Sequence, residues 1–138
     1  LLSDPSQEQV KKISALNDTG IDYCVFSSRA LPENTKQVPQ LQPLRAYSFE
    51  GTLIATDIGT AEFAITLAAP QKKFFYITSM EWTKATALTY DSLKKIYLND
   101  DMDLLVSNVE DYNLISNLFK EPNKIIEDWN FKEFFNEH

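Results

Sequence analysis

Hydrophobic positions divide the chain into two kinds of segment, short continuous apolar runs and longer stretches with helical spacing. The runs cover residues 21–28, 52–57, 73–82, 102–108 and 123–129. Their apolar residues follow one another instead of alternating with polar ones, which is typical of strands covered on both faces. The sequence therefore predicts five strands.

Stretches with helical spacing precede the first run and follow the later ones. Residues 3–20 contain Val10, Ile13 and Leu16 on one face and end at Gly20, which predicts a helix with a glycine terminator. Further helices are predicted over 59–69, with Thr60 as a cap, and over 89–99, 109–119 and 131–138. For 131–138 the alternative to a buried helix is a frayed tail. The apolar stripes expected to face the sheet are Phe63 and Leu67, Leu93, Ile96 and Tyr97, Tyr112, Ile115 and Phe119, and Phe131, Phe134 and Phe135.

This alternation of strands and helices predicts the fold class. An α/β chain with non-alternating strands forms a parallel sheet with helices on both faces. We expect residues 1–138 to form a single three-layer Rossmann-like domain with about five mostly parallel strands, a flavodoxin-like strand order being the close variant. The irregular stretch 29–51 contains three prolines, Pro32, Pro39 and Pro43. It is predicted to be a long surface loop with a functional role.

Composition and charge restrict the partners and the compartment. The 138 residues are 43% hydrophobic and carry a net charge of −7, which disfavours direct binding to nucleic acid or to anionic membranes. No apolar stretch approaches the length of a membrane span. Cys24, the single cysteine, cannot form an internal disulfide, so a reducing, cytoplasmic location is expected. The start at Leu1-Leu2 instead of Met indicates a fragment, a processed product or a trimmed chain.

Several chemistries are disfavoured by what the chain lacks. His138 is the one histidine, so Ser-His-Asp and Cys-His mechanisms and histidine-containing zinc sites are not expected. Neither a GxGxxG nor a GxxxxGK[ST] motif occurs,. Residues 99–103 are rich in oxygen ligands but lack the glycine and glutamate of an EF-hand, which favours a solvated turn. We therefore expect no metal and no bound cofactor.

Polar residues follow every predicted strand. Because the carboxyl ends of parallel strands meet at one edge, where ligands bind in open α/β sheets, we expect these residues to line a site. Ordinary alternatives remain open, namely helix caps for Asp57, Thr60 and Ser107, a surface ion pair for Arg29, and boundary packing for the two Trp residues. The predicted set is Ser27, Ser28 and Arg29, Asp57 and Thr60, Ser79, Glu81 and Trp82, Ser107, and Glu127, Asp128 and Trp129.

The types of these residues indicate a class of ligand. An indole beside carboxylates suits sugars or nucleosides, which present both apolar ring faces and hydroxyl groups. Asp57 and Glu81 are the predicted catalytic residues, either of them acting as general base on an acceptor hydroxyl. The other members of the set are predicted to bind the substrate.

A family resemblance covers residues 74–134. The strand "LLVSN" leads into a helix that begins with the acidic pair Glu110 and Asp111, and "IIEDW" is followed by Asn130, Phe131 and Phe134. This pattern resembles the N-terminal Rossmann-like domain of GT-B glycosyltransferases, nearest to glycosyltransferase-like proteins of large tailed bacteriophages. The resemblance implies a nucleotide-sugar co-substrate and an acceptor-binding role. It also implies that the donor-binding second domain of that architecture has no counterpart in residues 1–138.

Two functions follow as hypotheses. The first is a glycosyltransferase-like domain, the acceptor-binding half of a phage-type transferase, with a sugar or nucleotide-sugar as ligand. The alternative is a non-catalytic phage-type binding protein that acts on a host protein through its acidic surface. A protein partner or a homo-oligomer is expected for either function, and the location is the host cytoplasm if a phage encodes the chain. Salt-sensitive association with a protein, without binding of a nucleotide-sugar, would favour the alternative.

Overall fold

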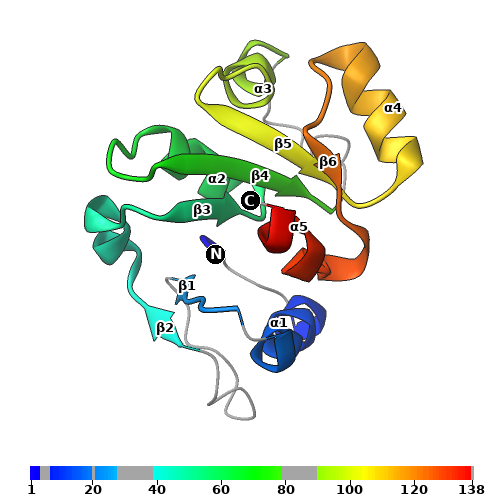
Figure 1. The fold of residues 1–138 in the computed structure, drawn as a ribbon. Helices are drawn as coiled ribbons and strands as arrows, with labels where there is room; N and C mark the ends of the chain where they lie inside the picture. The colour runs from blue at the N-terminus through cyan, green and yellow to red at the C-terminus, as the bar shows by residue number, and fades with distance from the viewer. Residues whose placement is uncertain (4–6, 20, 28–38, 79–89, 138) are drawn as a thin grey trace.

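Four parallel strands form the main body of the sheet (Figure 1). The computed structural model describes residues 1–3, 7–19, 21–27, 39–78 and 90–137. The four strands pair in the order of the chain, with Ala55 beside Phe75 and Phe75 beside Leu104. Their bounds are β3 Thr52–Ala55, β4 Lys72–Ile77, β5 Met102–Val106 and β6 Lys124–Ile125.

Residues 1–3 join this sheet to a second pair of parallel strands, β1 (Val25–Phe26) and β2 (Gln40–Leu41). Leu2 forms parallel bridges to Phe26 on one side and to Ala55 on the other. The backbone nitrogen of Leu2 donates to Ile54 O (2.9 Å), and that of Ser3 donates to Phe26 O (3.0 Å). The segment 1–3 therefore lies in the centre of one continuous parallel sheet.

The resulting strand order is β2, β1, residues 1–3, β3, β4, β5, β6. The chain moves outward from its first segment through β1 and β2, then returns and continues on the other side through β3 to β6. Numbered along the chain, this is the 3-2-1-4-5-6 order of the Rossmann fold with one further strand. The predicted α/β fold is confirmed, and the order reverses between residues 1–3 and β3.

Three helices cover one face of the sheet, namely α2 (Ile58–Ile65), α3 (Tyr90–Tyr97) and α4 (Val109–Leu118). Their buried side chains include the predicted stripe residues Leu93, Ile96, Tyr97 and Ile115. The 3-10 helix η3 (Pro43–Ser48) adds Ala46 to the same cluster. The predicted loop 29–51 thus contains a strand and a short helix, which its prolines did not indicate.

The opposite face is covered by α1 (Gln7–Ser14) with the following η1 (Ala15–Thr19), and by α5 (Phe131–Glu137) (Figure 1). Ile13 and Leu16 pack there with Phe131 and Phe134, each with at most 4% of its surface exposed. The closing helix is therefore buried against the sheet, as predicted, and helices lie on both faces.

A buried tyrosine fixes the segment between β6 and α5. The hydroxyl of Tyr76 donates to Ile126 O (2.6 Å) and accepts from the backbone nitrogen of Trp129 (3.1 Å). The 3-10 helix η5 (Glu127–Trp129) has positive φ angles at Asp128 (49°) and Trp129 (61°), which cost energy for residues other than glycine,. Tyr76 thus stabilises an unfavourable turn from inside the sheet.

We expect Tyr76→Phe to lower the free energy of unfolding by about 1–3 kcal/mol, because it removes one hydroxyl that serves both a buried carbonyl and a buried amide. The matched control is Tyr23→Phe, since that hydroxyl donates to Asn17 Oδ1 (2.9 Å) at an exposed site. Urea unfolding followed by fluorescence measures both changes. Equal losses in the two variants would contradict the role given to Tyr76.

The same tyrosine predicts a pH dependence at alkaline pH. Burial raises the pKa of Tyr76 above its ordinary value of 10.0; nearby Asp128 also raises it, and the bond from Trp129 lowers it. A raised folded-state pKa gives stability that is fully present below pH 10 and is lost as the pH rises through the folded value,. The difference in Tm between wild type and Tyr76→Phe, measured from about pH 8 to about pH 12, should therefore shrink at the upper end. A constant difference would contradict this expectation.

Candidate functional site

Three hydroxyl side chains form a row across three neighbouring strands at the reversal of strand order. Because Leu2 is level with Phe26 and Ala55, the next residues Ser3, Ser27 and Thr56 are level with one another. Their exposed fractions are 0%, 3% and 2%, and they are the buried polar side chains among the described residues. Thr56 Oγ1 donates to Ser3 Oγ at 2.6 Å. We call Ser3, Ser27 and Thr56 the hydroxyl row.

The position of the hydroxyl row is the one where open α/β sheets bind ligands. Each member directly follows the last paired residue of its strand, so the row lies at the carboxyl end of the sheet. After residues 1–3 the chain continues to α1, which packs on one face of the sheet. After the neighbouring strand β3 it continues to α2, which packs on the opposite face. Connections that leave to opposite faces open a crevice between neighbouring strands.

Asp57 and Thr60 begin α2 beside the hydroxyl row. Asp57 is the N-cap, and its Oδ1 accepts from the backbone nitrogen of Thr60 (2.8 Å). Thr60 Oγ1 in turn accepts from the backbone nitrogens of Asp57 (3.2 Å) and Thr56 (3.3 Å). Asp57, the other cap considered, is therefore the N-cap. Thr60 is not at the N-cap position but is the third helical residue, and its side chain completes a capping box with Asp57,. The two residues together hold the end of β3 in place.

Two substitutions of Asp57 measure how much its side chain contributes to stability as the cap of α2. Asp57→Ala should lower the free energy of unfolding by about 0.5–2 kcal/mol, while Asp57→Asn should cost a few tenths, because asparagine keeps the accepting oxygen and caps equally well. Chemical denaturation of both variants measures this. A loss in Asp57→Asn as large as in Asp57→Ala would show that the cap is not what this side chain contributes.

Ser107 lies at the same edge but away from the hydroxyl row. It follows β5, which is separated from residues 1–3 by β3 and β4, a distance of about 14 Å at the usual strand spacing. Asn108 caps α4 by accepting from the nitrogen of Asp111 (2.8 Å), and its amide donates to Ser107 Oγ (3.4 Å). The structure therefore places Ser27 and Asp57 after the strands on either side of residues 1–3, and Ser107 beyond β4.

Glu127, Asp128 and Trp129 form η5 on the face of the sheet that α1 and α5 cover. Trp129 is 7% exposed and packs edge-to-face on Tyr76, with ring centroids 5.2 Å apart. Asp128 pairs with Lys12 of α1 at 2.5 Å on the surface, and Glu127 is exposed. Boundary packing, the alternative considered for the indole, describes the position of Trp129.

The remaining predicted residues, Ser28, Arg29, Ser79, Glu81 and Trp82, lie outside the described residues. The roles assigned to them stay predictions. Pattern alone did not single out Ser3 and Thr56. The available signal was the position of Thr56 directly before Asp57 at the end of a predicted strand, whereas Ser3 follows a segment too short to be recognised as a strand.

Comparison with known proteins adds no family. No family model matches the chain, and no curated protein or solved structure matches it. Within the described ranges, no helix is long and apolar enough to cross a membrane. Among the same residues, no group of three or more His, Cys, Asp and Glu side chains is arranged to hold a metal ion.

Proposed function

We propose that the domain is the acceptor-binding half of a glycosyltransferase-like protein and binds a sugar or nucleotide-sugar beside the hydroxyl row. The observation that supports this most is the row itself at the reversal of strand order. Buried hydroxyls require hydrogen-bond partners, and Thr56 and Ser3 bond to each other,. Three such side chains in one row at the carboxyl end of the sheet favour a polar site. Hydroxyls both donate and accept, which suits the hydroxyl and phosphate oxygens of such ligands.

Asp57 supplies the proposed chemistry. In the transfer, an acceptor hydroxyl loses its proton to the Asp57 carboxylate while its oxygen forms a bond to the anomeric carbon of the donor sugar. The bond from that carbon to the nucleoside diphosphate breaks, and the diphosphate leaves with the electron pair. Asp57 is half-buried beside Thr56, and its Oδ1 is fixed by Thr60. The carboxylate is thus held in a set orientation at the edge of the proposed site.

Calorimetric titrations with glucose, as an acceptor sugar, and with UDP-glucose test the proposal. Thr56→Val keeps the shape of the side chain but removes the hydroxyl that donates to Ser3 Oγ. Loss of this hydrogen bond should weaken binding about tenfold. The control is Thr66→Val, the same change at the other end of α2, where Oγ1 donates to Phe63 O (2.7 Å). Failure of the wild type to bind either glucose or UDP-glucose, or equal weakening in both variants, would overturn the proposal.

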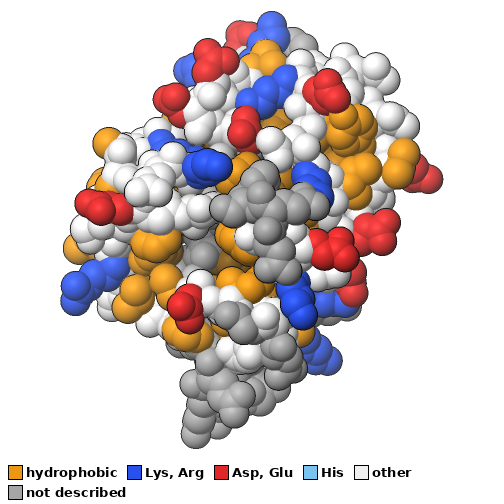
Figure 2. Space-filling view, in the orientation of Figure 1, with side chains coloured by type: hydrophobic (Ala, Val, Ile, Leu, Met, Phe, Trp, Pro, Cys, Tyr) orange, Lys and Arg blue, Asp and Glu red, His pale blue; other side chains and the backbone are white. Residues whose placement is uncertain are grey.

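A second candidate function, binding of a protein partner, is favoured by the exposed surface of β2 and η3 at one edge of the sheet. Leu41, Leu44 and Tyr47 are 44%, 74% and 55% exposed, and both residues of β2 are exposed. Figure 2 shows hydrophobic side chains around η3 as well as over α4. An exposed sheet edge with apolar neighbours accepts a partner strand. Concentration-dependent sedimentation that Leu44→Asp abolishes would support self-association, and a monomer at all concentrations would exclude it.

A further inference from the structure

An exposed apolar surface surrounds the 3-10 helix η3 at the β2 edge of the sheet. Leu41, Leu44 and Tyr47 are 44%, 74% and 55% exposed, and Figure 2 shows the hydrophobic side chains around η3. A 3-10 helix has three residues per turn, so Leu44 and Tyr47 share one face of η3,. We call Leu41, Leu44 and Tyr47 the η3 patch.

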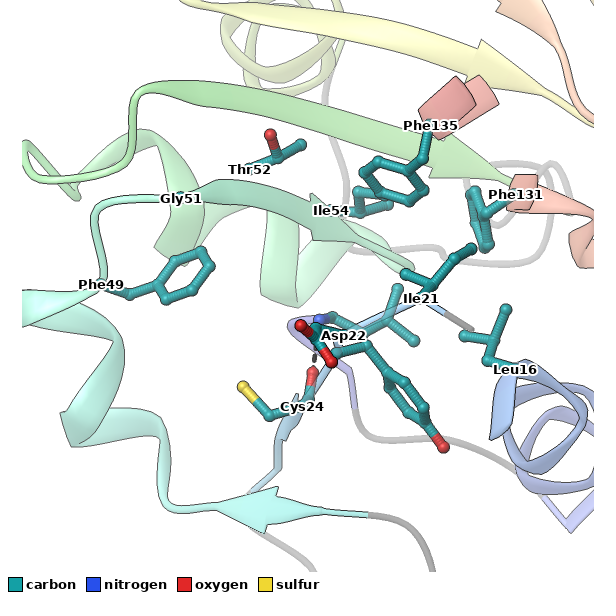
Figure 3. Close-up of a pocket in the computed structure, with 12 residues that line it drawn as sticks. Leu16, Ile21, Asp22, Cys24, Phe49, Gly51, Thr52, Ile54, Phe131 and Phe135 are labelled. Atoms are coloured by element: carbon teal, nitrogen blue, oxygen red, sulfur yellow. Dashed lines mark hydrogen bonds between the residues drawn. The ribbon is translucent and has the colours of Figure 1, made fainter. Parts of the chain in front are cut away.

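The η3 patch is held in place by contacts with the rest of the domain. Ala46, on another face of η3, is fully buried. The ring of Tyr47 packs edge-to-face on Phe63 of α2, with centroids 5.4 Å apart. Phe49, directly after η3, packs on Phe26 and also lines the amino-end cavity, a space of about 490 Å³ at the amino end of the sheet (Figure 3). A surface that is already ordered loses little conformational entropy when it binds a partner.

The charge of the segment that carries the η3 patch differs from that of the whole chain. The 138 residues include 20 acidic and 13 basic side chains, which gives a net charge of −7. Between positions 39 and 49 the single charged residue is Arg45, and Glu50 follows. Two copies, each negative overall, repel each other, and the repulsion is weakest where the facing surfaces are close to neutral. The η3 segment is therefore a favourable place for a second copy to approach.

Arg45 and Glu50 give this segment the self-complementary charge that a symmetric dimer needs. Both side chains are exposed, and neither forms an ion pair with another described residue. In a two-fold interface residue i of one copy contacts residue j of the other, and j contacts i. Tyr47 and Ser48 lie midway between Arg45 and Glu50 in the chain. A two-fold axis beside them brings Arg45 of each copy toward Glu50 of the other copy.

We propose that the η3 patch binds the η3 patch of a second copy in a symmetric dimer, with Leu44 and Tyr47 at the centre and two Arg45–Glu50 pairs at the rim. This inference rests on the second candidate function, protein binding through β2 and η3, and names the partner. Apolar side chains supply affinity at the centre, while charges at the rim select the partner and its orientation. A partner with charge of one sign would leave Arg45 or Glu50 unpaired, whereas a second copy pairs both.

Sedimentation equilibrium of the wild type and of charge-reversal variants tests the proposal. Arg45→Glu and Glu50→Lys each convert both rim pairs into like-charge pairs, so each should weaken dimerisation about tenfold. An equimolar mixture of the two variants should dimerise as tightly as the wild type, because the mixed dimer has opposite charges at both rim positions. Far-UV circular dichroism checks that every variant is folded.

The control is Glu133→Lys, the same change at an exposed residue of α5 on the other face of the sheet. Glu133→Lys and Glu50→Lys both change the net charge of the chain from −7 to −5, because each replaces one acid with one base. General repulsion between copies falls equally in both variants, so Glu133→Lys should associate at least as tightly as the wild type. Weakening by Glu50→Lys is then specific to the rim pair.

A wild type that stays monomeric up to about 1 mM would overturn the proposal. A dimer that Glu50→Lys leaves unchanged or tightens would overturn it as well, and so would a mixture of the two variants that stays monomeric. If Leu44→Asp abolishes the dimer while the charge reversals have no effect, the symmetric pairing is wrong and the second candidate function stands. A dimer that Leu44→Asp leaves intact would overturn both.

Discussion

Leu2→Asp is expected to leave the chain unfolded in buffer without denaturant. Leu2 is 2% exposed and bridges the two halves of the sheet through Phe26 and Ala55. Loss of a buried leucine side chain alone costs about 2–5 kcal/mol. A carboxylate in the same place adds the cost of an uncompensated buried charge. Together these approach the entire stability of a domain, about 5–15 kcal/mol.

The matched control is Leu44→Asp, which makes the same change at a side chain that is 74% exposed. At a protein concentration where the wild type is a monomer, this variant should keep the far-UV circular dichroism and the urea midpoint of the wild type within error, since surface substitutions usually cost less than about 0.5 kcal/mol. A folded Leu2→Asp variant with a near-normal midpoint would contradict the placement of residues 1–3 in the centre of the sheet.

Trp129→Ala should lower the free energy of unfolding by about 3–5 kcal/mol, the usual cost of removing a buried indole. Trp129 is 7% exposed and packs on Tyr76 and Phe131, with centroid distances of 5.2 Å and 6.1 Å. Urea unfolding measures the loss. This large effect on stability is the signature of packing, whereas a sugar-stacking indole on the surface would affect binding and leave stability nearly unchanged.

The control for Trp129→Ala is a substitution of the preceding residue, Asp128, which pairs with Lys12. Asp128→Asn keeps the backbone turn, since asparagine tolerates positive φ, and removes a pair whose side chains are 72% and 45% exposed,. Exposed pairs contribute about 0–1 kcal/mol, so this variant should be close to wild type. If Asp128→Asn cost as much as Trp129→Ala, the electrostatic contact rather than the indole would hold η5.

Most elements of the fold could be predicted from hydrophobic spacing because they are long enough to show it. The helical stripes of α3, α4 and α5 and the apolar runs of β3, β4 and β5 each repeat over several residues,. Residues 1–3 and Gln40–Leu41 form strands too short for any period, and Pro39 and Pro43 beside β2 are typical of loops,. These segments are strands because they pair with neighbouring strands, and the local sequence does not indicate that pairing.

The candidate site could be predicted only in part for a related reason. The rule that polar residues gather after parallel strands found Ser27 and Asp57, which lie beside the reversal of strand order. Which strand ends are neighbours depends on the order of strands in the sheet, and that order required the position of Leu2. The turn at Trp129 depends on positive φ angles and on the buried Tyr76 hydroxyl, and neither is visible in the pattern of residues.

We propose that the hydroxyl row at the carboxyl end of the sheet forms a ligand site. Titration of the ¹⁵N-labelled chain with UDP-glucose, followed by amide chemical shifts, tests this proposal residue by residue. We predict saturable shifts at Ser3, Ser27, Thr56 and Asp57, with residues 51 and 52 at the amino end unchanged. Shifts confined to the amino-end cavity, or no saturable shifts at all, would contradict the proposal.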